Sequence, residues 1–298
     1  MTDLERKLAR LRDILDEMGS VLVAYSGGAD SAFLLWAALD ALGPGRVLAA
    51  TASSPVFARR ELEAAEELAR RMGARHRFVP TGQLEDGQFV LNPPRRCYFC
   101  KREILARLKE TARENDLAWT IEGSNVDDRD EYRPGSQAVR EAGVRSPLQG
   151  IGVRSPLQEI GVRSPLEEAE LTKAEIRALS RRVGLPTWNK PAQTCLVTRF
   201  PYGVRLTVEK LKRVEAAEDL LAGMGFGDLR VRDHADPAVG SIARIEVAGD
   251  QVARLAQPET AARVAAALKD LGYRYVTLDL LGYRRGNLGN PAQDDLTG

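Results

Sequence analysis

One short stretch, Ser26–Ser31, constrains the fold of this chain more strongly than any other, and its sequence is Ser-Gly-Gly-Ala-Asp-Ser. The apolar run 21–25 before it is typical of a buried strand, and residues 32–36 after it are typical of a helix. Two glycines allow a tight turn and a close approach to a ligand. The N–H groups at the start of a helix lack partners within the helix and, with the helix dipole, favour phosphate. The stretch therefore predicts a strand, an anion-binding turn and a helix in succession.

The same stretch is similar to the pyrophosphate loop of the N-type ATP pyrophosphatases. It lacks the Gly-Lys-Ser/Thr ending of a Walker loop and the spaced glycines of dinucleotide-binding folds. Enzymes with this loop cleave ATP between the α and β phosphates and attach AMP to a substrate oxygen, and a nucleophile then displaces the AMP. Asp30 suits such a site if it caps the helix, binds a cation or contacts a ribose. A tight turn without a ligand is the structural alternative.

Apolar runs and amphipathic segments alternate through the first part of the chain. The predicted strands are 21–25, 47–52, 76–79 and 118–122, and the predicted helices are 3–18, 32–42, 57–72 and 101–115. This alternation predicts a Rossmann-like α/β fold, in which helices cover both faces of a parallel sheet. Ligands bind at the carboxyl ends of such strands, where Ser26, Ser53, Glu122 and Gly123 would lie.

A smaller α+β domain is predicted to follow. It contains helices 207–223 and 258–271 and strands 229–232, 242–247 and 275–280. With 298 residues, the chain is long enough for about two domains. We predict an adenylation domain over 1–203 and a substrate-binding or oligomerisation domain over 204–285. The polar tail 286–298 has no periodicity and is predicted to be disordered.

An internal repeat occupies residues 144–168. Val-Arg-Ser-Pro-Leu begins at Val144 and recurs at Val153 and Val162, a spacing too short for the common solenoid folds. We interpret it as a tandem duplication inside a surface loop, in which one copy has the structural role; a binding arm is the alternative. The last copy leads into 171–175, whose pattern predicts a capping box and a helix to about residue 183.

The charge balance limits the classes of partner. Lys and Arg number 43 and Asp and Glu 42, for a net charge of +1, which argues against a nucleic-acid-binding protein. No apolar run approaches the length of a membrane span, and the N-terminus lacks a signal-peptide core. We therefore expect a cytoplasmic protein with no nucleic-acid partner and no membrane partner.

The chain contains three cysteines, Cys97, Cys100 and Cys195. Their odd number argues against a disulfide framework and for metal or thiol chemistry. The Cys-x-x-Cys pair could bind a metal or cluster, form a redox pair, or consist of two unremarkable thiols. One further cysteine is too few for a four-cysteine zinc site, but three suit a 4Fe–4S cluster with one open iron. Its negative charge would be offset by neighbouring basic residues, Arg95, Arg96 and Lys101.

Cys195 lies in a loop segment beside Lys190 and Arg199. Positive neighbours stabilise a thiolate, which is the nucleophilic form of cysteine. A buried, inert cysteine is the alternative, although that would better suit the interior of a helix or strand. The segment therefore predicts a functional thiol.

Two further groups of charged residues are candidate contacts for ligands. Glu122–Asp130 carries four acidic residues at a strand end, where magnesium, a ribose or adenine would be bound; a solvated acidic turn is the alternative. Arg230, Arg232 and Arg244 alternate with apolar residues on predicted strands. Arginines on one face can bind a phosphate bidentately, although this pattern also fits charges on a solvent-exposed face.

Several of these motifs occur together in one family. Segments 26–31, 92–101, 122–130, one Val-Arg-Ser-Pro-Leu unit, 190–203 and 244–247 resemble, in this order, the LarE family. Its members are ATP-dependent sulfur transferases that help to build the nickel-pincer nucleotide cofactor of lactate racemase. The resemblance covers almost the whole chain. The departure is the repeat, of which the family pattern has one copy and this chain has three.

The resemblance implies a defined reaction. The substrate would be pyridinium-3,5-biscarboxylic acid mononucleotide. In the presence of Mg²⁺, ATP would adenylate its two ring carboxylates in turn, and each adenylation would release pyrophosphate. A sulfur nucleophile then displaces AMP and leaves a thiocarboxylate. Some members give up the sulfur of a cysteine whose position Cys195 matches, and others hold a 4Fe–4S cluster on three cysteines. The complete trio in this chain favours the cluster.

The resemblance also implies roles for individual residues and assembly as a homo-oligomer. Catalytic roles are expected for Cys195, Cys97 and Cys100, which would also hold the cluster. The expected ATP contacts are Ser26, Gly27, Gly28, Asp30, Ser31, Ser53, Gly123 and Asp127. The expected substrate contacts are Thr198, Arg199, Glu218, Arg230 and Arg232.

Two other functions fit parts of this pattern. An amide synthetase resembling NAD or GMP synthetases would share the loop and use ammonia, with no need for three cysteines. A tRNA thiolation enzyme would share the sulfur chemistry, but the near-neutral charge counts against it.

Overall fold

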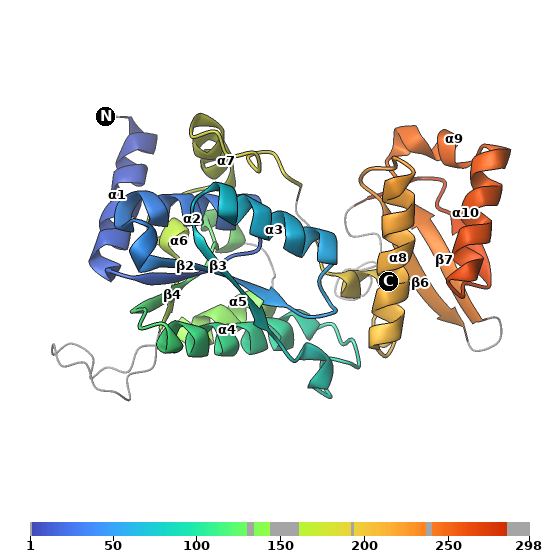
Figure 1. The fold of residues 1–298 in the computed structure, drawn as a ribbon, viewed down its shortest axis with the longest axis horizontal. Coiled ribbons are helices and arrows are strands. Elements are labelled where there is room, and N and C mark those ends of the chain that lie inside the picture. Colours follow the sequence, from blue (N-terminus) through green and yellow to red (C-terminus); the bar gives the residue numbers. More distant parts are fainter. Residues whose placement is uncertain (1, 130–133, 144–160, 192–193, 237–239, 285–298) are drawn as a thin grey trace, which may run out of the picture. The chain divides into compact units, whose positions relative to one another are not determined.

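A computed structural model describes residues 2–129, 134–143, 161–191, 194–236 and 240–284. The chain forms two compact units, coloured along the sequence in Figure 1. The first comprises Met1–Gln83 and Arg95–Gln193, and the second comprises Leu84–Pro94 and Thr194–Gly298. The predicted domain boundary at residues 203 and 204 stays a prediction, and the predicted disordered tail 286–298 lies outside the described residues.

A five-stranded parallel sheet forms the centre of the first unit and confirms the predicted fold class. Its strand order is β3-β2-β1-β4-β5, and each neighbouring pair is parallel. The strands are β1 (Val21–Ala24), β2 (Val47–Ser53), β3 (Arg75–Pro80), β4 (Trp119–Ile121) and β5 (Val162–Arg163). The order reverses beside β1, so the carboxyl ends of β1 and β4 flank the position where such sheets bind ligands.

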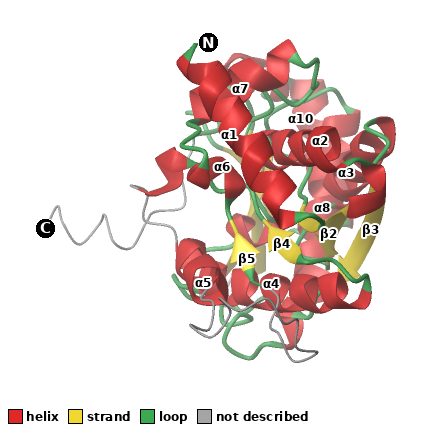
Figure 2. Cartoon of the chain, turned by 90° about the vertical axis from the view of Figure 1, so that its left-hand side faces the viewer, coloured by secondary structure: helices red, strands yellow, loops and turns green. Residues whose placement is uncertain are grey.

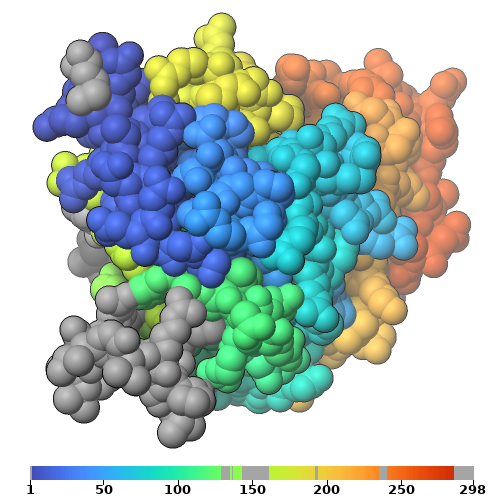
Figure 3. All heavy atoms as spheres, turned by 60° about the vertical axis from the view of Figure 1, so that its left-hand side comes forward, coloured from blue at the N-terminus to red at the C-terminus, as the bar shows by residue number. Residues whose placement is uncertain are grey.

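Helices cover both faces of this sheet (Figure 2). They are α1 (Asp3–Met18), α2 (Ala29–Leu42), α3 (Arg59–Arg71), α4 (Arg96–Glu114), α5 (Pro134–Gly143), α6 (Pro165–Glu168) and α7 (Lys173–Arg182). Successive residues of a strand face opposite sides of a sheet. Val21 and Val23 accordingly pack with α1, α2 and α7, whereas Leu22 packs with α4. In the space-filling view, α1 and α2 form a continuous layer of atoms (Figure 3).

The start of α4 differs from the sequence-based prediction, and helix α5 was not predicted. Helix α4 begins at Arg96 rather than at residue 101, and the prediction of a later start was therefore wrong. The helix starts soon after Pro93 and Pro94, which are unfavourable inside a helix. Its N-cap residue Arg95 forms no side-chain capping bond, so the sequence carries no start signal there.

The repeat supplies the edge strand of the sheet, which the sequence analysis did not predict. The third copy forms β5 and α6, and its Val162, Pro165 and Leu166 are buried. A strand of two residues is too short to show an alternating pattern. The copies that begin at residues 144 and 153 lie outside the described residues. The predicted helix after the repeat is confirmed as α7, with Thr172 and Glu175 forming the capping box.

The second unit has the predicted α+β composition. Its sheet has the order β6-β7-β8, with β6 (Arg230–Asp236) antiparallel to β7 (Gly240–Glu246) and β8 (Tyr275–Leu278) parallel to β7. Helices α8 (Val208–Gly223), α9 (Val252–Leu255) and α10 (Pro258–Asp270) enclose a core on one face of this sheet.

Short 3-10 helices occur in both units, at Pro44–Arg46, Gln83–Glu85, Val126–Arg129, Leu196–Arg199 and Gly249–Gln251. Among the described residues, no helix has the length and apolar character needed to cross a membrane.

Candidate active site

The loop Ser26–Ser31 connects the carboxyl end of β1 to the start of α2, as predicted. The two serines hold its shape, because their hydroxyl oxygens lie 3.1 Å apart. The N–H of Ser26 donates to Oγ of Ser31 over 3.2 Å, and Oγ of Ser31 donates to the carbonyl of Gly28 over 3.3 Å. Gly28 is the N-cap of α2, so the first turn of this helix presents its N–H groups beside the loop. This geometry is suited to an anion.

Two glycines allow the backbone to approach its neighbours closely at this loop. Gly27 has φ +67°, and a Cβ there would lie 2.8 Å from Cβ of Ala65 in α3. Gly123 follows β4, and a Cβ there would lie 3.2 Å from the nitrogen of Ser31. The structure therefore brings the loop after β1 and the residues after β4 together, two segments that the sequence analysis assigned to ATP.

The acidic residues of the predicted ATP site contact the start of α7. Asp30 forms an ion pair with Lys173, the first residue of that helix. Asp127 accepts a hydrogen bond from the backbone N–H of Lys173 over 2.8 Å. Ser53, at the end of β2, accepts a backbone hydrogen bond from Thr81. Lys173 was missed by sequence reasoning, because its contact with Asp30 spans 143 residues of sequence.

Glu122 is the centre of a buried polar network. Its carboxylate lies 3.2 Å from Nζ of Lys101 and accepts hydrogen bonds from the N–H of Ser124 and the hydroxyl of Ser164. Burial alone would raise the pKa of Glu122, but the charge of Lys101 and these hydrogen bonds outweigh burial and lower the pKa below its usual value. Glu122 is therefore held as a carboxylate, and Ser164 of the third repeat copy helps to hold it.

The three cysteines belong to different units. Cys97 and Cys100 lie one turn apart in the first turns of α4, and such i, i+3 positions share a helix face. Nε2 of Gln83 lies 3.7 Å from the sulfur of Cys100. Cys195 belongs to the second unit, where it is the N-cap of the 3-10 helix Leu196–Arg199. Within the described residues, no three His, Cys, Asp or Glu side chains are grouped as a metal site.

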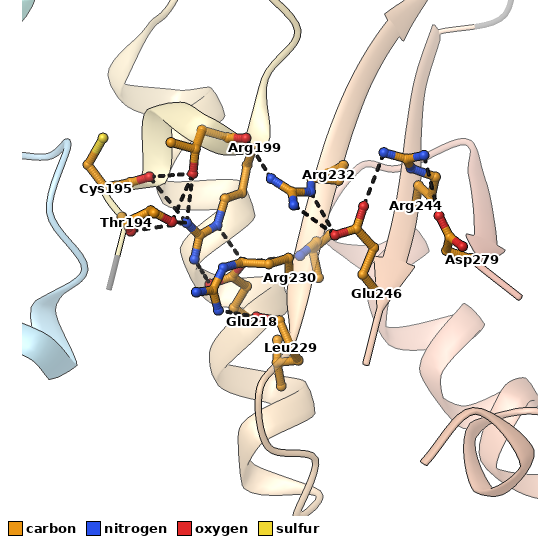
Figure 4. A network of polar contacts seen from close by, with 12 residues as sticks. Thr194, Cys195, Arg199, Glu218, Leu229, Arg230, Arg232, Arg244, Glu246 and Asp279 are labelled. Atoms are coloured by element: carbon orange, nitrogen blue, oxygen red, sulfur yellow. Dashed lines mark hydrogen bonds and ion pairs between the residues drawn. The ribbon is translucent and has the colours of Figure 1, made fainter. Parts of the chain in front are cut away.

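Arg199 fixes the backbone around Cys195 (Figure 4). Its guanidinium is buried and binds Glu218 bidentately, through Nε and Nη2 at 2.8 and 2.9 Å. Its Nη1 donates to the carbonyl oxygens of Thr194 and Cys195 and to the hydroxyls of Thr194 and Thr198. A bidentate pair of this kind is strong and directional. The buried ion pair therefore positions the Cys195 segment against α8.

The arginines of the small sheet extend this network. Arg232 binds Glu246 through Nε and Nη2 and donates to the carbonyl of Thr198 over 2.7 Å. Arg244, opposite Arg232 on β7, pairs with Glu246 and with Asp279. These contacts place three basic side chains, Arg199, Arg232 and Arg244, in ion pairs (Figure 4).

Arg230 is bound differently from these three arginines. It donates to the carbonyl of Leu229 over 2.6 Å, and its guanidinium lies 4.8 Å from the ring centre of Tyr283. Burial, followed by the charge of Arg199, lowers its pKa. No carboxylate of the described residues lies within ion-pair distance of Arg230. Among the arginines of this region, Arg230 therefore has the charge that an anionic ligand would best balance.

Hydrogen bonds thus link four of the five predicted substrate residues in the second unit, Thr198, Arg199, Glu218 and Arg232. The fifth, Arg230, is close enough for the charges of Arg199 and Glu218 to affect its pKa. Arg199 and Glu218 bind each other, so their side chains support the Cys195 segment. Contact of any of the five with a substrate stays a prediction.

Comparison with known proteins identifies the family. No family model matches the chain. The chain is 37% identical over 290 residues to the pyridinium-3,5-bisthiocarboxylic acid mononucleotide synthase of Lactiplantibacillus plantarum, a LarE protein, and the match covers 97% of this chain and 96% of the relative. The chain belongs to the LarE family. Because the named LarE relative is a synthase, this LarE-family chain is an enzyme.

Two uncharacterised proteins also match the LarE-family chain over nearly its whole length. The protein slr1717 of Synechocystis is 40% identical over 285 residues, 96% of this chain and 97% of the relative. The protein MJ0830 of Methanocaldococcus jannaschii is 27% identical over 282 residues, 94% of this chain and 98% of the relative.

Proposed function

We propose that this LarE-family enzyme uses ATP to convert the carboxylates of pyridinium-3,5-biscarboxylic acid mononucleotide into thiocarboxylates. The loop Ser26–Ser31 carries the proposal, because it presents helix N–H groups beside a turn that Gly27 and Gly28 keep narrow. The name of the relative from L. plantarum supports the choice of product. We further propose that the enzyme is cytoplasmic, acts on a small-molecule nucleotide without nucleic acid or membrane partners, and forms a homo-oligomer.

Adenylation is the first proposed step. A carboxylate oxygen of the substrate attacks the α-phosphorus of ATP, the bond to the bridging oxygen of the β-phosphate breaks, and pyrophosphate leaves. The N–H groups at the start of α2, with Ser26 and Ser31, would hold the phosphates. Mg²⁺ would offset their charge, and Asp30 and Asp127 supply oxygen ligands of the type that Mg²⁺ prefers.

Sulfur transfer is the second proposed step. A sulfur nucleophile attacks the carbonyl carbon of the acyl adenylate, the carbon–oxygen bond to AMP breaks, and the thiocarboxylate remains. Cys195 is suited to this step because Arg199 fixes its backbone carbonyl. Three thiolates are the donor set that a 4Fe–4S cluster with one open iron requires, and such a cluster would supply an iron-bound sulfide. We propose this cluster on Cys97, Cys100 and Cys195. The sulfur of Cys195 itself is the alternative source: its thiolate would displace AMP to give a thioester, and elimination would then break the Cβ–Sγ bond, release the thiocarboxylate and leave dehydroalanine at position 195.

Substrate binding would use the arginines of the second unit. Arg230 is buried and has no carboxylate partner among the described residues, so the phosphate of the mononucleotide would balance its charge. Arg232 and Thr198, which are hydrogen-bonded to each other, would contact the remainder of the substrate.

The adenylation step is tested by pyrophosphate release that depends on the pyridinium dicarboxylate. The Cys195→Ala variant should retain this release and lose formation of the thiocarboxylate. Normal sulfur transfer by Cys195→Ala would contradict the role of this thiol. Turnover with ammonia by a variant with all three cysteines changed to alanine would instead support an amide synthetase.

The sulfur source is tested on protein purified without oxygen. The iron content, the visible spectrum and the mass of the intact chain after turnover are measured on the wild type and on Cys97→Ala/Cys100→Ala. The cluster predicts an iron-loaded wild type of unchanged mass and an inactive double variant. A colourless wild type that loses the equivalent of hydrogen sulfide, together with an active double variant, would establish Cys195 as the sacrificial source.

A further inference from the structure

Two lysines from distant segments contact the loop Ser26–Ser31. Lys173, at the start of α7, pairs with Asp30, although 143 residues separate them in sequence. Nζ of Lys190 donates to the carbonyl of Gly27 over 3.3 Å across 163 residues, and it lies 2.9 Å from a carboxylate oxygen of Glu61. The fold therefore places two ammonium groups against the backbone and the carboxylate of this loop.

Both ammonium groups keep donor capacity. A lysine ammonium has three N–H donors. Within the described residues, Lys190 has two acceptors, Gly27 and Glu61, and Lys173 has one acceptor residue, Asp30. The side chains are 21% and 34% exposed respectively, so a ligand in the loop can reach them. Each lysine can therefore donate to a further oxygen without giving up its present contact.

The charge of the expected ligand favours such donors in addition to Mg²⁺. Pyrophosphate is a polyanion, and the loop supplies neutral N–H groups and hydroxyls together with the carboxylate of Asp30. A carboxylate beside a polyanion is repulsive unless cations lie between them. Lys173 offsets the charge of Asp30. Lys190 brings a positive charge to Gly27 and to Glu61 of α3.

We propose that Lys173 and Lys190 are positioning residues that bind the β- and γ-phosphates of ATP and then the pyrophosphate that leaves. The assignment rests on the proposed use of ATP at this loop. It separates two parts of the nucleotide site: the two lysines hold the part of ATP that AMP lacks, and they do not contribute to binding of the AMP portion.

The test compares ligands that differ in these phosphates. The affinities of ATP with Mg²⁺, of pyrophosphate and of AMP are measured by calorimetry on the wild type, Lys173→Gln and Lys190→Gln. Each substitution should weaken ATP and pyrophosphate by about tenfold or more, the effect of removing a charged hydrogen bond, and leave AMP unchanged. Lys7→Gln is the matched control, since Lys7 pairs with Glu175 of the same helix α7 at 2.8 Å with similar burial, and it should leave all three affinities unchanged.

The outcomes separate this inference from the proposed function. A wild type that binds neither ATP nor pyrophosphate would overturn the use of ATP. A wild type that binds them while both lysine variants bind all three ligands normally, or lose AMP equally, would overturn the role of the lysines. Asp30→Asn/Lys173→Gln removes both partners of the ion pair and leaves no unpaired carboxylate. Weak pyrophosphate binding with retained AMP binding in this variant supports the inference, and recovered pyrophosphate binding overturns it.

Discussion

At the scale of single residues, the Arg199–Glu218 pair determines how the Cys195 segment is held. Both side chains are almost fully buried, and Glu218 also accepts the N–H of Val231, which ties α8 to β6. The pair thus connects helix α8, strand β6 and the segment that contains Cys195. An isolated buried charge is much less favourable than a buried pair. Removal of one partner should therefore lower the free energy of unfolding strongly.

Glu218→Gln should lower the free energy of unfolding by about 3–5 kcal/mol, because it leaves the guanidinium of Arg199 buried without a counter-charge. The amide oxygen of the glutamine can still accept from Val231. Unfolding in urea measures the effect. Arg12→Gln, which breaks the exposed pair of Arg12 with Asp40, is the control and should cost less than about 1 kcal/mol. Equal losses in the two variants would contradict a special role for the buried pair.

Gly27→Ala should destabilise the protein by about 1–3 kcal/mol, since the added Cβ meets Ala65 and the positive φ disfavours a side chain. Gly19→Ala is the control, because Gly19 has φ +72° with open space around its Cβ position, and it should show the backbone cost alone. Adding Ala65→Gly to Gly27→Ala should recover only part of the steric cost, because the Cα of residue 65, 3.0 Å from the added Cβ, remains. If Gly19→Ala and Gly27→Ala lose equally, close approach of α3 is not the constraint at this loop.

Glu122 should make the first unit sensitive to acid. The pKa of Glu122 in the folded state lies below its ordinary value of 4.5, so its carboxylate contributes stability above that value. This contribution is lost as the pH falls through the folded-state pKa. Between about pH 6 and pH 3, Glu122→Gln should therefore lose less stability than the wild type, measured by urea unfolding at each pH. Parallel losses in the two proteins would show that Glu122 is not held as a carboxylate.

At the scale of elements, the third repeat copy has a structural role. Val162 and Arg163 form β5, Leu166 is buried, and Ser164 donates to Glu122. Gly161 precedes this copy, and Gly143 and Gly152 precede the other two in the sequence. A copy removed from the chain therefore leaves the same Gly-Val junction behind.

Deletion of one nine-residue unit, 144–152, should change the free energy of unfolding by less than about 1 kcal/mol, because loop length has a weak effect on closure entropy. Leu166→Ala should cost about 2–5 kcal/mol, as for other buried leucines. Both are measured by urea unfolding. A small effect of Leu166→Ala would mean that another copy can take the place of the third in the sheet.

At the scale of the whole molecule, the two units can be followed separately. All three tryptophans, Trp36, Trp119 and Trp188, belong to the first unit. Their fluorescence therefore reports the unfolding of the unit that carries the loop Ser26–Ser31, and Cys195 reports the second unit through alkylation in a Cys97→Ala/Cys100→Ala background.

ATP with Mg²⁺ should stabilise the tryptophan transition by about 2.7 kcal/mol at a concentration one hundred times its Kd, because the ligand binds only folded protein. AMP, which lacks the phosphates that Lys173 and Lys190 are proposed to bind, serves as the comparison ligand. A tryptophan transition that does not respond to ATP would place ATP elsewhere than in the first unit. A shift of Cys195 alkylation by the same amount would show that the two units unfold together.

Much of the architecture could be predicted because it depends on local patterns. The alternation of apolar runs with amphipathic segments predicted the α/β class, and the capping-box pattern of Thr172 and Glu175 predicted the start of α7. The loop Ser26–Ser31 could be assigned to the junction of a strand and a helix, because its glycines and serines have conformational preferences of their own. The LarE resemblance was also readable from motifs in order, and the relative from L. plantarum confirms it.

The sequence by itself thus determined the class of the fold, the family and the residue types available for chemistry. Only the tertiary structure decided which of these residues meet. Lys173 reaches Asp30, Arg199 pairs with Glu218, and two residues of a repeat become the edge of a sheet. The physical reason is that secondary structure depends mainly on residues that are neighbours in sequence. The partner of a buried charge depends instead on packing between segments that lie far apart in the chain.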